Sequence, residues 1–181
     1  MPSTILGLPF HPLVVHAVVV LVPLAALMLA ASAVSPRFRR WALYATPAAA
    51  VLGLVLVPVA TGTGENLERS VQSTPALEEH TELGDTLLPF MIVLTVLALA
   101  VFVLERRAVR AVPSTNGPGA TRAGAPSDVR DRLDSPLLVR AVAVLALVAS
   151  LATLVQVGRI GHSGANAVWK DTSQSASGSG E

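Results

Sequence analysis

The chain has 181 residues, of which 52% are hydrophobic and only 14% carry a charge, with a formal net charge of +1 at pH 7. Soluble domains carry roughly 25% charged residues, so the composition excludes an ordinary soluble domain. The sequence holds no cysteine, which excludes disulfides, thiolate metal sites and cysteine-held iron–sulfur clusters.

Four stretches are long and apolar enough to cross a hydrocarbon core, which takes roughly 20 residues each. They cover about residues 12–34, 41–60, 86–104 and 137–157. We therefore predict an all-α fold, an integral membrane four-helix bundle with up-down-up-down topology. Residues 1–172 are expected to form this single transmembrane domain.

Proline marks where several of these helices begin and bend. Three prolines suit the first helical position, where the missing N–H costs nothing: Pro12, Pro75 and Pro136. The third helix thus begins well before its apolar part. Four other prolines lie inside apolar segments, where we expect kinks: Pro23, Pro47, Pro58 and Pro89.

Two segments have compositions that cannot build a core. Residues 112–134 are rich in Pro, Gly, Ser, Thr, Arg and Asp, which predicts a flexible linker. Residues 173–181 are rich in Ser and Gly, which predicts a disordered tail.

The arginines set the orientation. Nearly all of them lie between helices one and two or between, or just inside, helices three and four: Arg37, Arg39, Arg40, Arg106, Arg107, Arg110, Arg122, Arg130, Arg132 and Arg140. The positive-inside rule then places both of these loops in the cytoplasm and both termini outside. We expect a multi-pass protein of the bacterial cytoplasmic (plasma) membrane.

All four histidines lie next to ends of apolar segments that this topology places on the outer side. His11, beside Pro12, is interpreted first as a helix cap or a headgroup contact. His16 is flanked by valines and lies roughly 6–8 Å into the apolar layer at 1.5 Å per residue. An ionisable group at that depth suggests a functional role, and a hydrogen bond to a backbone carbonyl is the alternative.

The other two histidines lie beside small or acidic residues. His80 shares a helix face with Gly84, which leaves room for a bulky group, and a solvated pair with a neighbouring carboxylate explains it equally well. His162 lies in a Gly-His-Ser-Gly stretch just past helix four, where a glycine-capped helix end is the alternative. Arg159 precedes it by three residues.

The opening Gly-Leu-Pro-Phe-His-Pro-Leu-Val-Val-His at residues 7–16 resembles that of bacterial membrane proteins with domain of unknown function 2231. Residues 60–62, 78–84 and 161–164 fit the same family. The family is distantly similar to four-helix b-type membrane cytochromes, and some relatives resemble fusions to Rieske iron–sulfur domains. The resemblance implies His16, His80 and His162 as candidate haem b ligands, and Arg159 as a partner of a haem propionate.

The hypothesis that follows is one b-type haem near the outer face, in an electron-transfer or redox-accessory role. The cytoplasmic half holds no histidine, so only one outer site can be built. A transition metal held by His16, His80 and His162 is an alternative, as is a non-catalytic scaffold or accessory subunit. We expect no independent enzymatic activity and no nucleic acid partner. The lipid bilayer is a partner, and a redox protein or membrane complex is a further one to consider.

Overall fold

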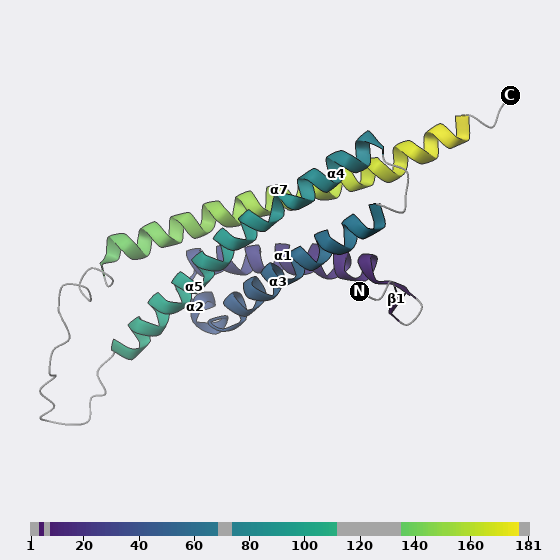
Figure 1. Cartoon of the computed structure of the whole chain (residues 1–181). Helices are drawn as coiled ribbons and strands as arrows, with labels where there is room; N and C mark the ends of the chain where they lie inside the picture. The colour runs from purple at the N-terminus through teal and green to yellow at the C-terminus, as the bar shows by residue number, and fades with distance from the viewer. Residues whose placement is uncertain (1–3, 6–7, 69–73, 112–134, 178–181) are drawn as a thin grey trace, which may run out of the picture.

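The structure is a computed structural model that describes residues 4–5, 8–68, 74–111 and 135–177, with side chains for residues 11–65, 74–110 and 135–166. Its helices are α1 (Phe10–Val34), α2 (Pro36–Trp41), α3 (Ala45–Glu68), α4 (Pro75–Asp85), α5 (Leu87–Ala111) and α7 (Pro136–Ser177) (Figure 1). Ahead of α1, two short strands, β1 (Thr4–Ile5) and β2 (Leu8–Pro9), pair antiparallel with Thr4 opposite Pro9.

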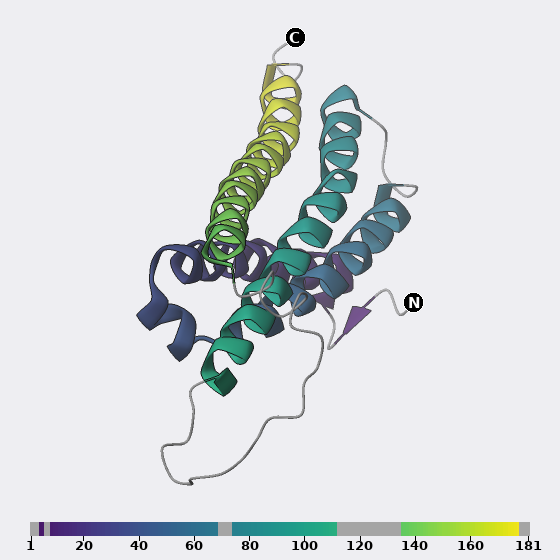
Figure 2. The same ribbon diagram turned by 90° about the vertical axis from the view of Figure 1, so that its left-hand side faces the viewer.

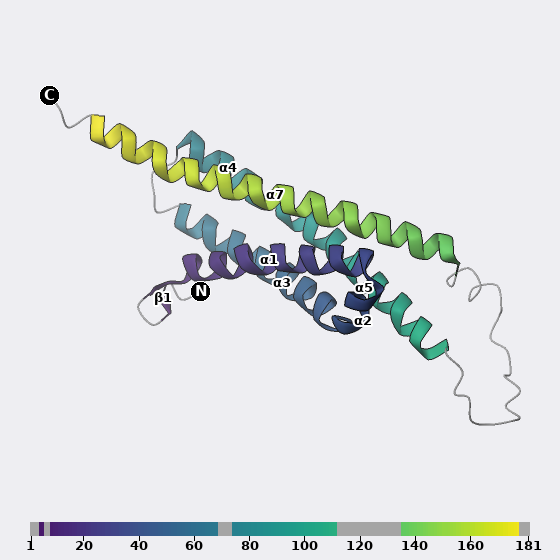
Figure 3. The ribbon, with the colours of Figure 1, turned by 180° about the vertical axis from the view of Figure 1, so that it is seen from behind.

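The predicted four-helix membrane bundle is confirmed. Four helical stretches of the described chain are long and apolar enough to cross a membrane: His11–Val34, Ala45–Glu65, Pro75–Arg110 and Pro136–Asn166. Figures 1 and 3 show that α1 and α4 begin, and α3 and α7 end, at the same end of the bundle. We call it the histidine end, because all four histidines lie in or next to these segments. The opposite end, with α2, is called the arginine end.

Each long helix packs against two neighbours, in the order α1, α3, α5, α7 and back to α1. In Figure 2, α1 runs obliquely across the others. Val22, Leu29, Met91 and Leu94 are completely buried together with several alanines. Such small residues let helices approach closely in a bilayer, where packing replaces the hydrophobic effect between helices. Large apolar side chains such as Val20 point outward, as contact with lipid requires.

The prolines inside the spans interrupt one helix and leave two others continuous. α1 contains Pro23 and α3 contains Pro58 without a break. The third span, in contrast, divides at Thr86 into α4 and α5. Pro89 explains this division, because it has no N–H for the Asp85 carbonyl and its ring crowds that carbonyl.

A side chain of α7 forms hydrogen bonds with the residues at the junction of α4 and α5. Gln156 is 4% exposed, and its Nε2 donates to the Thr86 hydroxyl at 2.5 Å and to the Leu83 carbonyl at 3.5 Å. The Thr86 hydroxyl in turn donates to the Leu83 carbonyl at 2.6 Å. These hydrogen bonds attach the junction of α4 and α5 to the fourth span.

Some boundaries differ from the sequence prediction. The second span begins at Ala45 instead of residue 41, because Pro36–Trp41 forms α2, whose N-cap Ser35 accepts from the Phe38 N–H. α7 continues to Ser177 and includes residues 173–177, which were predicted to be disordered. After Gly164 no glycine or proline interrupts the chain before Gly178, so nothing breaks the helix earlier. Residues 178–181 and the predicted linker 112–134 lie outside the described residues.

Glu105 anchors α2 to α5 at the arginine end. Its side chain is 12% exposed, and the Arg39 Nε donates to it at 2.7 Å; Arg39 also donates to the Ser32 carbonyl at 3.3 Å. Arg40, 67% exposed, lies 3.9 Å from the same carboxylate. We expect Arg39→Met to lower the free energy of unfolding by roughly 1–3 kcal/mol, because it leaves a buried carboxylate without its main partner.

The matched control is Arg40→Met, which removes an exposed ion pair and is expected to cost less than about 0.5 kcal/mol. Unfolding in mixed detergent micelles, followed by circular dichroism, measures both values. Equal losses for the two variants would contradict this account of the Glu105 contact.

Candidate functional site

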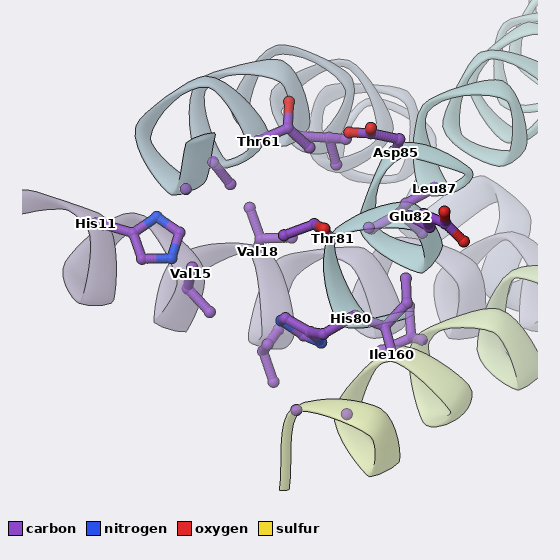
Figure 4. Close-up of a pocket in the computed structure, with 18 of the residues that line it drawn as sticks. His11, Val15, Val18, Thr61, His80, Thr81, Glu82, Asp85, Leu87 and Ile160 are labelled. Carbon is purple, nitrogen blue, oxygen red and sulfur yellow. The ribbon is translucent and has the colours of Figure 1, made fainter. Parts of the chain in front are cut away.

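A cavity of about 560 Å³ lies at the histidine end, where α1, α3, α4 and α7 meet the start of α5 (Figure 4). This volume lies within the range of ligand pockets, roughly 300–1,000 Å³. Its walls are mainly aliphatic: Val15, Val18, Val19, Val57, Ala60, Leu77, Leu87, Val157 and Ile160. We call this cavity the outer pocket, after the side of the membrane predicted for it.

His11 of α1 lines the outer pocket and is held by α3. Its Nδ1 lies 3.0 Å from the Thr63 hydroxyl oxygen. That hydroxyl lies 2.9 Å from the carbonyl oxygens of both Val59 and Ala60 and has a single proton to donate. When this proton goes to either carbonyl, the hydroxyl oxygen accepts from the imidazole, which puts the ring proton on Nδ1 and the lone pair on Nε2.

His80 of α4 is held by α7 in the same way. Its Nδ1 lies 3.1 Å from the hydroxyl oxygen of Ser163, a buried residue. The Ser163 hydroxyl donates to the Ile160 carbonyl at 2.9 Å. Donation to this carbonyl again favours a ring proton on Nδ1. In the described part of the chain, the side-chain hydrogen bonds of both rings are made at Nδ1, and the Ala60 backbone also lies within hydrogen-bond reach of His11.

A glycine makes room for each ring. A Cβ on Gly64 would lie 3.1 Å from the His11 Cε1, and a Cβ on Gly164 would lie 3.0 Å from the His80 Cε1. Both distances are tighter than nearly all real Cβ contacts. Each glycine directly follows the hydroxyl residue that binds the same ring. We call the pairs Thr63–Gly64 and Ser163–Gly164 the two imidazole seats.

The two seats form a structural repeat that the sequence does not reveal. In the first half of the bundle, α1 carries His11 near its start and α3 carries the Thr63–Gly64 seat near its end. In the second half, α4 carries His80 and α7 carries the Ser163–Gly164 seat. The histidine and its hydroxyl partner are 52 residues apart in the first half and 83 in the second. The hydroxyl–glycine pair is the only shared sequence signal, and it is too short to be noticed by itself.

The other two histidines do not reach the outer pocket. His16 is exposed, and its Nδ1 lies 2.6 Å from the Pro12 carbonyl oxygen, which is the backbone hydrogen bond considered as the alternative. Five residues after His11, it is turned by about 140° around the helix, away from the cavity. His162 is exposed as well, since its neighbour Ser163 occupies the inward position.

Arg159 is likewise exposed and donates to the Gln156 side-chain oxygen at 3.4 Å. The structure thus brings His80 to the outer pocket, adds His11, and leaves His16, His162 and Arg159 outside it. Within the described residues, no three His, Asp or Glu side chains are grouped to hold a metal ion. The three histidines of the predicted transition-metal site are therefore not assembled.

The remaining polar side chains of the pocket are hydroxyls and carboxylates. Thr61 donates to the Pro58 carbonyl at 3.2 Å, and Thr81 donates to the Glu78 carbonyl at 3.0 Å. The carboxylates belong to exposed residues: Glu65, Glu82 and Asp85. No Lys or Arg is found among the described residues that line the cavity.

Comparison with known proteins identifies the family of the chain. No curated protein matches the chain, and no solved structure matches it. A family model described as "Predicted membrane protein (DUF2231)" matches residues 7–176, which include the whole outer pocket and all of the six helices described above except the last residue of α7. The chain therefore belongs to the family of predicted membrane proteins that share domain of unknown function 2231.

Proposed function

We propose that this protein is a membrane-embedded cofactor-binding protein whose outer pocket holds one large, mostly apolar redox molecule between His11 and His80. The observation that carries this proposal is the pair of imidazole seats, which leave two bare Nε2 atoms on the wall of one apolar cavity. Both rings are half-buried and line the cavity, so a ligand that fills it displaces water from them and takes over their hydrogen bonds.

The arrangement also argues against histidines that merely pack or cap. A packing histidine needs no fixed tautomer, whereas metal- or ligand-binding histidines commonly donate their second N–H to a fixed acceptor. Here two such acceptors, Thr63 and Ser163, come from different helices and serve the same cavity.

Haem b is the cofactor that the resemblance to b-type cytochromes implies, and the pocket fits it in part. His11 and His80 would hold the iron through their imidazoles, the aliphatic walls suit a macrocycle, and the iron would supply one-electron transfer. The periphery does not fit, since three carboxylates and no basic residue line the described pocket where propionates would need positive charge.

The proposed role is that of a redox accessory protein in the cytoplasmic membrane of a bacterium. A redox protein or a membrane complex on the outer side is its proposed partner. The resemblance to b-type cytochromes and the two imidazoles that line the pocket support this role.

The experiment is to identify what the pocket carries. The protein is purified in mild detergent, its absorption spectrum is recorded before and after dithionite, and the organic extract is analysed by mass spectrometry. We expect one redox molecule per chain; a Soret band that sharpens on reduction would identify it as haem b. Preparations that contain no stoichiometric chromophore or extractable redox molecule would contradict the proposal.

A further inference from the structure

Every polar side chain that lines the outer pocket offers a hydrogen-bond acceptor. His11 and His80 present bare Nε2 lone pairs, because Nδ1 carries the proton in both. Thr61 and Thr81 have already given their hydroxyl protons to helical carbonyls. The carboxylates only accept when ionised. The pocket therefore selects a ligand that brings donors.

The two imidazoles are equivalent acceptors in equivalent seats. Figure 4 shows His11 and His80 extending from different helices, with the apolar side chains of Val15 and Val18 between them in that view. An apolar body with two equivalent donors matches this arrangement. The carboxylates of the pocket lie on exposed residues and the walls around the imidazoles are aliphatic, so a neutral molecule suits the interior better than a cation does.

The pocket also has a side that faces lipid. Val19 lines the cavity and is 54% exposed on the apolar surface of α1. A ligand dissolved in the bilayer can therefore reach the cavity without crossing water, as a long-chain lipid-soluble molecule requires.

We infer that the outer pocket recognises a quinol, an apolar molecule whose aromatic ring carries two hydroxyl groups, each donating to one of the bare Nε2 atoms of His11 and His80. This inference rests on the proposed function and names the ligand class of the same pocket. It also explains why the periphery of haem does not fit, since a quinol carries no carboxylates.

The binding test uses decyl-benzoquinol, its quinone and its dimethyl ether with the full-length protein in nanodiscs. The ether keeps the ring and the chain but cannot donate. We expect the quinol to bind at least about tenfold more tightly than the ether, the difference expected from losing two hydrogen bonds. The quinone, which only accepts, is expected to bind as weakly as the ether.

A variant tests the role of the seats. Ser163→Ala removes the acceptor of His80 Nδ1, so the ring is free to carry its proton on Nε2 and donate to a quinone. We expect the ratio of quinol to quinone affinity to fall about three- to tenfold. Ser150→Ala is the matched control in the same helix, because the Ser150 hydroxyl is buried without a partner and away from the pocket. It should leave the ratio unchanged.

The outcomes separate this inference from the proposed function. Equal affinity for quinol, quinone and ether would overturn quinol recognition. A histidine-dependent haem b in the purified protein would also overturn it while the proposed function stands. If no molecule is carried and none of the probes binds, both fail.

Discussion

His11→Ala and His80→Ala are each expected to lower the cofactor content of the purified protein at least about tenfold. In the proposed complex each imidazole is one of the two groups that contact the ligand directly, and in metal sites even a supporting residue behind such a group typically contributes 10- to 100-fold to affinity. The measurement is the molar ratio of bound redox molecule to chain, from absorbance and mass spectrometry of equal amounts of folded protein.

His16→Ala and His162→Ala provide matched controls. Both remove an exposed imidazole at the same end of the bundle, and neither residue lines the outer pocket. Their cofactor content should stay within about twofold of wild type. A loss confined to these two variants would place the site on the histidines that the sequence ranked first and would refute the assignment to His11 and His80.

Gly164→Val is expected to cost about as much occupancy as the loss of the imidazole itself, roughly tenfold. The valine Cβ would lie 3.0 Å from the His80 Cε1. Its two methyl groups are expected to clash with the imidazole in its position beside Ser163. His80 must then swing out of its seat, and misplaced ligands bind poorly even when they are chemically intact. Cofactor content measures this effect, and Gly164→Ala should give a smaller loss.

Gly158→Val makes the same chemical change in the same helix, where an added Cβ meets nothing within 4 Å. Its occupancy should equal that of wild type. If both valine variants lose the cofactor equally, the cause is damage to α7 and the seat has no special role.

The sequence was sufficient for the membrane architecture and for the end of the bundle that carries the site. Apolar stretches of spanning length and the arginine distribution require no knowledge of side-chain direction. The sequence was insufficient for deciding which histidines line the outer pocket. Depth favoured His16 over His11, yet depth says nothing about which side of a helix faces inward. That side depends on packing against α3 and α7, which only the three-dimensional arrangement supplies.

The seats were hidden for a similar reason. A hydroxyl bound to its own helix carbonyl is an ordinary feature of a membrane helix, and its oxygen becomes significant only when a ring from another helix meets it. Thr63 and His11 are brought together by tertiary contact alone. The division of the third span at Thr86 was foreseen only as a kink near Pro89.

That division has a mechanical consequence. α4 and α5 meet at Thr86 within one span, and α4 packs far more extensively on α7 than on α5. Ser163 ties His80 to the fourth span, and Gln156 ties the junction at Thr86 to the same span. Tilting of α5 in response to bilayer thickness would be absorbed at Thr86, so the spacing of the two imidazoles would follow the packing of α1 and α3 against α7 and α4.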